Sequence, residues 1–212
     1  MFHKVYNWGF ETEPDPNLNS RQVYWPRGRV LGGSSSINGL IYIRGQKYDY
    51  DLWSSLGNPG WSWDECLPYF KRLEHNDLGE SKTRGVNGPM WATTVPGGDK
   101  LVDAFISAAG ACGVPHVNDF NDGHQEGVGY FQLSTRKGFR CSTAVAYLKP
   151  ARNRTNLAVE TDAQVTRITF DGKRATGVHF HQRGQSVVVK ANREVILSAG
   201  AIQSPQLLML AG

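Results

Sequence analysis

The stretch Trp25–Gly45, which decides the fold, reads WPRGRVLGGSSSINGLIYIRG. At its centre is the pair Gly32-Gly33, where a backbone without Cβ atoms can turn tightly and approach a ligand closely. Three serines follow at once, and serine both caps helices and offers a hydroxyl for hydrogen bonds. A helix beginning at Ser34–Ser36 would aim free N–H groups and the positive end of its dipole over the glycines. The pattern therefore predicts an anion site, with an ordinary Gly/Ser loop as the alternative.

The composition is that of an ordinary globular chain. The 212 residues are 40% hydrophobic and 20% charged, which is enough for one large domain or for one domain and part of another. The net charge of +4 is too small to indicate nucleic-acid binding, and no Lys/Arg run forms a stripe that follows phosphates. Arg27 and Arg29, directly before the glycine pair, either add charge to the anion site or are solvated.

The cysteines and histidines indicate neither a disulfide framework nor a metal site. Cys66, Cys112 and Cys141 are odd in number and widely spaced, and reduced thiols favour an intracellular, cytoplasmic location. His116 and His124 lack partners at metal-ligand spacing, so we expect solvated loop histidines. No apolar run reaches the roughly 20 residues of a membrane-spanning helix, and no signal-peptide core is visible.

Periodicity and capping residues predict the elements of the first 150 residues. Residues 1–24 are expected to be an extended approach to the glycine turn, because prolines break any helix there. Ser62 with Glu65 forms a capping box, and Asp99 is an N-cap. Helices are expected over 47–56, 62–75, 99–111 and 140–148, the last stopped by Pro150, with strands over 90–95 and 129–135.

From Asn156 onward the hydrophobic period changes to two. Strands are expected over 157–160, 165–170, 176–181 and 186–190, with hairpin turns at Asp171-Gly172 and Arg183-Gly184. Residues 194–198 are predicted to form a short buried strand, followed by a helix that starts near Ser204-Pro205. The predicted fold class is α/β, with a small antiparallel meander attached to a larger cofactor domain.

Two long motifs resemble the signatures of one family. Trp25–Gly45 resembles the first signature segment of the glucose–methanol–choline (GMC) flavin oxidoreductases, and Glu194–Gly212 (EVILSAGAIQSPQLLMLAG) resembles the second. Further runs follow the family's order between them: Asp119-Phe120-Asn121, Gln125–Gly129, Arg140 with Ser142-Thr143-Ala144, and Asn156–Ile168. The resemblance covers nearly the whole chain and implies that residues 1–212 are a partial FAD-binding domain of the GMC type.

The resemblance implies FAD as the cofactor and a set of contacts along it. The expected contacts are Val30, Asn38, Gly39, Leu40 and Ile41 at the flavin; Gly32, Gly33 and Ser34 at the diphosphate and ribityl chain; Val165 at the adenine; and Ala199, Gly200 and Ala201 where the main chain passes the cofactor again. Without the resemblance, Val165 is a plain strand residue and Ile41 is core. The position at which some family members link flavin covalently through histidine is Ile37 here, so we expect non-covalent FAD.

The resemblance also implies oxidation of an alcohol, with hydride passing to flavin N5 and a histidine far along the family's chain assisting proton removal. None of the six histidines lies in a matching segment, so no catalytic residue is assigned. The G-x-G-x-x-G fingerprint is absent as well. We therefore expect a fragment of a choline-dehydrogenase-like alcohol dehydrogenase or oxidase, with an inert remnant or a nucleotide- or partner-binding module as the alternative. The alcohol and the electron acceptor, oxygen or a quinone, stay open.

Overall fold

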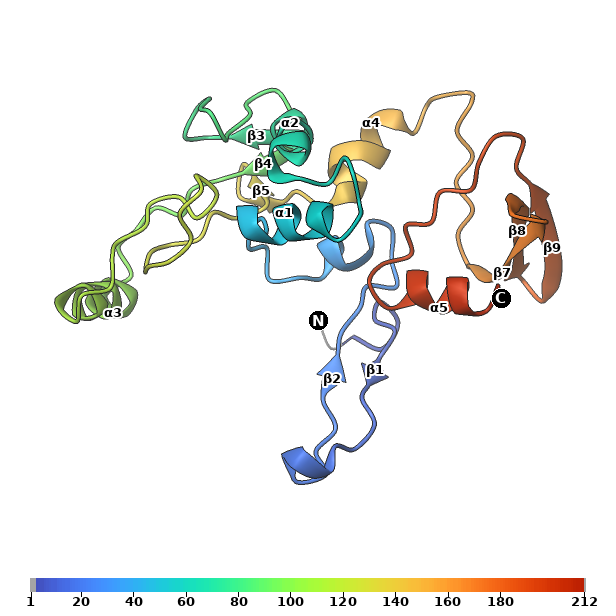
Figure 1. Cartoon of the computed structure of the whole chain (residues 1–212), viewed down its shortest axis with the longest axis horizontal. Coiled ribbons are helices and arrows are strands. Elements are labelled where there is room, and N and C mark those ends of the chain that lie inside the picture. Colours follow the sequence, from blue (N-terminus) through green and yellow to red (C-terminus); the bar gives the residue numbers. More distant parts are fainter. Residues whose placement is uncertain (1–2, 212) are drawn as a thin grey trace. The chain divides into compact units, whose positions relative to one another are not determined.

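The computed structural model describes residues 3–211, which form two compact units of helix and strand (Figure 1). Within these residues, unit 1 ends at Arg152 and unit 2 begins at Asn153. The predicted α/β class with a small antiparallel meander is confirmed. No helix among the described residues is both long and apolar enough to cross a membrane.

The long helices of unit 1 begin where capping side chains are available. They are α1 (Lys47–Ser55), α2 (Trp63–Leu73) and α3 (Lys100–Ala111). Ser62 and Glu65 form the predicted capping box of α2, and the Ser62 N–H donates to Glu65 Oε2 at 3.1 Å. The Asp99 carboxylate accepts the N–H groups of Leu101 and Val102 at the start of α3. These three predicted helices are confirmed to within two residues at each end.

A short parallel sheet follows α2 and replaces its predicted last turn. β3 (Glu74–Asn76) pairs with β4 (Met90–Ala92), so α2 ends two residues before the predicted His75, and the strand predicted over 90–95 is shorter. The Glu74 carboxylate is fully buried and accepts the Gly85 N–H at 2.8 Å. These contacts hold Glu74 in an extended conformation and outweigh local helix propensity.

The core of unit 1 lies between α1 and α2. Tyr50, Trp63 and Cys66 are buried, with Leu67 and Phe70 packed against them. The Tyr50 ring lies 5.6 Å from that of Trp63 and 5.5 Å from that of Phe70, distances typical of packed aromatic pairs. The apolar residues Leu67 and Phe70 of α2 thus belong to the core of unit 1.

The N-terminal residues form a hairpin instead of the predicted extended approach (blue in Figure 1). β1 (Phe10–Glu11) pairs antiparallel with β2 (Tyr24–Trp25), and a 3₁₀ turn over Pro16–Leu18 lies between them. The prolines exclude an α-helix, as predicted. The two arms close because the Val23 N–H donates to Thr12 Oγ1 at 2.9 Å, a contact that local sequence does not reveal.

Residues 129–151 are first extended and then helical. The only strands here are β5 (Thr135–Arg136) and β6 (Phe139–Arg140), so the strand predicted over 129–135 is wrong in extent. Leu133 instead makes single antiparallel bridges to Ile41 and Thr93. A π-helical turn over Ala144–Leu148 then runs into α4 (Lys149–Ala151). Pro150 does not stop this helix as predicted, because a first-turn residue needs no intrahelical N–H donor.

Unit 2 is an antiparallel meander followed by one helix. Its strands are β7 (Ala163–Asp171), β8 (Arg174–Gln182) and β9 (Gln185–Lys190), in the order β7-β8-β9. The three predicted strands of the meander are confirmed and are somewhat longer than predicted. Arg183-Gly184 forms the second turn as predicted, whereas the first turn is shifted by one residue to Gly172-Lys173.

Two further strands predicted for unit 2 are wrong. Residues 157–160 and 194–198 pair with no strand among the described residues. Ile196 is 78% exposed, so the run 194–198 is not a buried strand within this chain. The predicted helix follows as α5 (Gln203–Met209), with Pro205 in its first turn and Leu207 buried.

Candidate cofactor site

The glycine–serine turn is a single 3₁₀ turn over Gly33–Ser36, with Gly32 as its N-cap. The prediction of a helix beginning at Ser34–Ser36 is wrong, because Ile37 leaves the helical region at φ −128° and the chain turns again. A turn of four residues carries no appreciable macrodipole, so the dipole argument for an anion site does not hold. What remains is the shape of the turn and its free backbone groups.

Both glycines of the turn adopt left-handed backbone conformations, for two different reasons. Gly32 has φ +87°, and a Cβ there would lie 2.5 Å from Ser36 Oγ and 3.1 Å from Ala144 Cβ. Gly33 has φ +54°, and a Cβ there would meet nothing within 4 Å. Gly32 is therefore packed against the protein, whereas Gly33 faces open space where a ligand can approach.

The glycine–serine turn is held by the hydroxyl groups of its own serines and by Thr143, which lies more than 100 residues later in the sequence. The Ser35 hydroxyl donates to Gly32 O at 2.5 Å, and the Thr143 N–H donates to Ser35 Oγ at 3.0 Å. The Thr143 hydroxyl also donates to Gly32 O at 3.2 Å. Ser34 Oγ accepts the Gly28 N–H at 3.1 Å. Ser36 Oγ in turn donates to Leu31 O at 2.8 Å, so the side chains of all three serines are engaged within unit 1.

The next turn, Asn38–Ile41, contains a strained residue. Leu40 has φ +69°, a region that bulky residues rarely adopt. Asn38 Oδ1 accepts the Leu40 N–H at 3.0 Å, and the Leu40 carbonyl accepts the Ser134 N–H at 2.7 Å. Arg140 Nη1 donates to the same Asn38 Oδ1 at 2.6 Å. Such strain persists where surrounding contacts fix it, and it is common at ligand sites.

The outer face of these two turns is accessible and combines apolar side chains with free donors. Val30 is 39% exposed and Ile41 is 49% exposed, so the default assignment of Ile41 to the core is wrong. Within residues 3–211, the N–H groups of Gly39 and Ile41 donate no hydrogen bond. Ile41 bridges to Leu133 through its neighbours' hydrogen bonds, which leaves its own N–H and C=O on the opposite side. This face can cover a flat apolar ring and donate to polar atoms at its edge.

A buried ion pair anchors the end of the first signature segment. Arg44 Nη2 lies 2.7 Å from Glu74 Oε2, and both side chains are almost fully buried. Arg44 Nη1 also donates to Thr83 O at 2.8 Å. Burial, followed by the negative charge of Glu74, raises the pKa of the nearby Tyr42 phenol to about 12. Tyr42 therefore stays neutral at physiological pH, and the pair acts as a framework for the turns before it.

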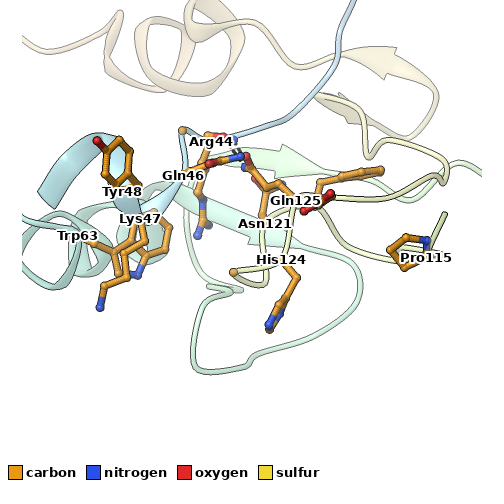
Figure 2. A pocket seen from close by; sticks show the side chains of 13 residues that line it. Arg44, Gln46, Lys47, Tyr48, Trp63, Pro115, Asn121, His124 and Gln125 are labelled. Carbon is orange, nitrogen blue, oxygen red and sulfur yellow. Dashed lines mark hydrogen bonds between the residues drawn. The ribbon is translucent and has the colours of Figure 1, made fainter. Parts of the chain in front are cut away.

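A hollow of about 490 Å³ lies beside this anchor (Figure 2). Asn121 Oδ1 accepts the Arg44 N–H at 2.8 Å, and Gln125 Nε2 donates to the Arg44 carbonyl at 2.7 Å. His124 points away from this group and is 91% exposed; together with the exposed His116 it confirms the prediction of solvated histidines. None of the predicted FAD contacts lines this hollow.

The structure brings together some of the predicted site residues and places the others in unit 2. Val30 and the predicted residues up to Ile41 lie in two consecutive turns of unit 1. Val165 lies on β7 opposite Phe180. Ala199, Gly200 and Ala201 are exposed in the turn before α5, where the Ala199 N–H donates to Ser204 Oγ at 3.0 Å. Gly200 has φ +94°, which supports a need for glycine there.

The sequence did not reveal the residues whose hydrogen bonds fix the two turns. Arg140 and Thr143 contact positions 102 to 111 residues earlier in the chain, and no spacing rule predicts such contacts. Asn121 and Gln125 were missed for the same reason. All four residues lie in runs that follow the order of the GMC family, and this resemblance could have marked them as candidates. It does not identify the residues that they contact.

Comparison with known protein families places this geometry among flavin enzymes. The family model described as GMC oxidoreductase matches residues 11–212. The chain is 46% identical over 207 residues to choline dehydrogenase, mitochondrial, of Mus musculus. It is also 46% identical over 207 residues to oxygen-dependent choline dehydrogenase of Sinorhizobium medicae. Each match covers 98% of this chain but only 35% and 38% of those relatives, so the chain spans little more than a third of their length.

Solved structures agree on the fold. Pyridoxine 4-oxidase from Mesorbium loti matches with a TM-score of 0.92 at 34% identity, covering 99% of this chain and 42% of that one. An FAD-dependent oxidoreductase from Chaetomium thermophilum matches with a TM-score of 0.90 at 31% identity, covering 98% of this chain and 39% of that one. The same backbone therefore occurs as part of longer oxidoreductases.

Proposed function

Because this chain belongs to the GMC oxidoreductase family, we propose that it is the N-terminal FAD-binding portion of a longer flavoenzyme. FAD is the cofactor that the family match supports, along with a structural relative described as FAD-dependent. The coverage of 35–38% of the curated relatives supports a partial domain. The proposal extends the domain to the whole of residues 1–212.

The observation that carries the proposal is the accessible face of the two turns between Gly32 and Ile41. Its backbone is strained at Leu40 and fixed by Asn38 and Arg140, while the N–H groups of Gly39 and Ile41 have no hydrogen-bond partner within the described residues. A rigid face with preplaced donors loses little conformational entropy when it binds a ligand. Such a face suits a flat heteroaromatic ring with polar edge atoms.

The residues of this face divide the work of holding FAD. We assign Val30 and the Asn38–Ile41 backbone to the flavin, where apolar contact excludes water and the N–H groups donate to the ring edge. Gly32, Gly33 and Ser34 are assigned to the diphosphate and ribityl chain, since Gly33 leaves the backbone open to close approach. Val165 and Ala199–Ala201, which lie in unit 2 and are not part of this face, are assigned to the adenine and to a second passage of the main chain.

Arg27 and Arg29 are not assigned to the diphosphate. Their guanidinium groups lie over the rings of Trp25 and Trp8, at 5.5 Å and 4.9 Å from the ring centroids. Each cation is therefore already engaged by an aromatic partner. The backbone of the glycine turn remains the stronger candidate for contact with phosphate.

The proposed reaction is oxidation of the CH–OH group of a small-molecule alcohol. When bound, FAD supplies the hydride acceptor at N5. The chain's own residues bind and orient that cofactor, and none is assigned as the proton acceptor. A choline-like alcohol is the first candidate, because two relatives carry choline dehydrogenase in their names. Oxygen and a quinone both remain candidate electron acceptors, and a cytoplasmic location remains a prediction, since one relative's name is mitochondrial.

The test compares the 212-residue chain with the full-length protein that contains it. Each is mixed with excess FAD, desalted, and assayed for flavin absorbance and for dye reduction with choline and a panel of other alcohols. We expect the full-length protein to retain FAD and to reduce the dye. The 212-residue chain should retain little flavin, because it lacks a glycine fingerprint. Two or three lost hydrogen bonds to a charged group, at about 1.5–3 kcal/mol each, weaken binding by roughly two to six decades.

The outcomes separate the enzyme from its alternative. Flavin retention and turnover in the full-length protein support the enzyme. A full-length protein that binds no flavin and reduces no dye supports an inert remnant or a partner-binding module. Stoichiometric flavin with turnover in the 212-residue chain would contradict the fragment assignment and place a proton acceptor within it.

A further inference from the structure

We propose that Arg140 is the positioning residue for the flavin-facing turn Asn38–Ile41, acting through backbone and side-chain contacts to Asn38 and Ser35. The inference rests on the proposed function, because the turn matters for catalysis only if it contacts FAD. Arg140 lies on β6, and its guanidinium group contacts Ser35 and Asn38. It does not touch the reacting atoms, so its contribution is to shape the surface that does.

One guanidinium group bridges three oxygen atoms of the turn region. Nη1 donates to Ser35 O at 3.0 Å and to Asn38 Oδ1 at 2.6 Å, and Nη2 donates to Asn38 O at 2.9 Å. These acceptors belong to the end of the glycine–serine turn and to the start of the flavin-facing turn. Arg140 therefore fixes the angle between the two turns, which a single-point donor such as lysine cannot do.

The contact is directed at the strained part of the backbone. Asn38 Oδ1, the acceptor of the shortest of these hydrogen bonds, also accepts the Leu40 N–H at 3.0 Å. Leu40 holds φ +69° only while neighbouring contacts outweigh the cost of that conformation. Removing the guanidinium leaves Asn38 free to rotate and releases Leu40. The free N–H groups of Gly39 and Ile41, on either side of Leu40, then lose their fixed directions.

The charge of Arg140 is not used in an ion pair. Among the salt bridges of the described residues, none involves Arg140, and its partners are carbonyl and amide oxygens. An arginine kept for an ion pair would show a carboxylate partner. Three residues later, the Thr143 N–H donates to Ser35 Oγ and the Thr143 hydroxyl donates to Gly32 O. Residues 140–143 therefore contact both turns.

The matched control is Arg136, four residues earlier in the same hairpin. Its guanidinium lies 4.9 Å from the centroid of the Trp91 ring and makes no contact with residues 32–41. Arg136→Ala removes the same side chain and the same charge from the neighbouring strand β5. Differences between Arg140→Ala and Arg136→Ala therefore report on the contacts to the turns, not on net charge.

The first measurement is amide hydrogen exchange of the 212-residue chain, which needs no cofactor. We expect Arg140→Ala to accelerate exchange across residues 35–42 by about tenfold or more, while β7 and β8 exchange as in the parent chain. Arg140→Lys should accelerate the same region, because one ammonium cannot bridge the three oxygens, and Arg136→Ala should leave it unchanged. Unchanged exchange over 35–42 in both Arg140 variants would overturn the positioning role whatever the flavin result.

The second measurement uses the full-length protein. We expect Arg140→Ala to weaken FAD binding about tenfold to a hundredfold and to change the visible circular dichroism of the flavin that remains bound. Millimolar guanidinium should restore the parent spectrum in Arg140→Ala, whereas Arg136→Ala should need no rescue. A parent protein with no flavin would overturn the proposed function, and the exchange result would still decide the role of Arg140. Normal FAD affinity and spectrum in Arg140→Ala, beside a flavin-loaded parent, would overturn the inference.

Discussion

The two signature segments have the same standing in sequence but differ in how the structure holds them. In the first, Trp25–Gly45, both turns are tied by side chains distant in sequence and end at a buried Arg44–Glu74 pair. In the second, Glu194–Gly212, the hydrogen bonds of the described residues are local, such as Ala199 N–H to Ser204 Oγ, and Ile196 is 78% exposed. The first is held by directed hydrogen bonds from distant positions of its own unit, whereas in the second only α5 packs on its unit, through contacts with β7 and the buried Leu207.

The difference shows what each kind of element requires. A turn needs a few directed hydrogen bonds and a tolerant residue, and unit 1 supplies both. A buried strand needs neighbours that pair its N–H and C=O groups, and no described strand lies beside residues 194–198. The predicted strand in the second signature segment therefore has no partner among the residues of this chain that the structure describes.

The largest effect is expected from a substitution in the buried Arg44–Glu74 ion pair, which anchors the first signature segment. Glu74→Ala removes the partner of buried Arg44 and should lower the free energy of unfolding by about 3–5 kcal/mol, because an unpaired buried charge is left behind. Urea unfolding of the 212-residue chain measures this. Asp64→Ala is the control, since its pair with Lys47 is exposed, and it should change little. Equal losses in the two variants would mean that the buried pair is no anchor.

A pH series tests whether Tyr42 belongs to the same anchor. Its pKa is raised to about 12 in the folded chain from an ordinary value near 10, so the folded state disfavours the phenolate. The stabilisation is complete below about pH 10 and is lost as pH rises through about 12, a change on the order of 2–3 kcal/mol. Tyr42→Phe should remove this pH-dependent loss. If the free energy of unfolding fell equally with pH between 10 and 12 in the parent chain and in Tyr42→Phe, the role of Tyr42 would be contradicted.

The glycine pair offers a finer test within the first signature segment. Gly32→Ala adds a Cβ 2.5 Å from Ser36 Oγ at φ +87°, and should destabilise the chain by about 1–3 kcal/mol. Gly33→Ala meets no atom within 4 Å and should cost less. The midpoints of urea unfolding give the comparison. A larger loss of unfolding free energy in Gly33→Ala than in Gly32→Ala would mean that Gly33, and not Gly32, is the glycine packed against the protein.

The smallest expected effect lies in the second signature segment. Ile196→Ala should change the free energy of unfolding by no more than about 0.5 kcal/mol, because the side chain is already 78% exposed. Ile168→Ala in β7 is the control, since Ile168 is buried, and it should cost about 2–5 kcal/mol. A comparable loss at Ile196 would restore the buried strand that the sequence predicts for residues 194–198.

Local sequence was a good guide where local physics decides the structure. The capping box at Ser62, the N-cap at Asp99 and the alternation of the meander gave the right elements, because short-range contacts stabilise them. Predictions from local sequence were wrong at Glu74, expected in a helix, and at Pro150, expected to end one. Glu74 is extended because of a buried ion pair, and Pro150 is tolerated because of its place in a new first turn.

The candidate site was predicted in outline but not in its support. The Gly32-Gly33 turn and the residues to Ile41 came from a family resemblance, and the structure places them in two consecutive turns of unit 1. The expected helix after Gly33 was wrong, since Asn38 and Arg140 draw the chain into a second turn. Contacts such as that of Arg140 join residues 102 positions apart, and they arise only from the folded chain.

The most direct test of the central claim, that the first signature segment holds FAD at its glycine turn, compares two glycines of equal strain. Gly33 has φ +54° and Gly172 has φ +55°, and a Cβ at either meets nothing within 4 Å, but Gly172 lies in the β7–β8 turn. Flavin content and FAD affinity are measured for Gly33→Ala and Gly172→Ala in the full-length protein. We expect Gly33→Ala to lose roughly 1–3 kcal/mol of FAD binding, while Gly172→Ala keeps full flavin occupancy. Equal flavin occupancy in both variants and in the parent protein would contradict it.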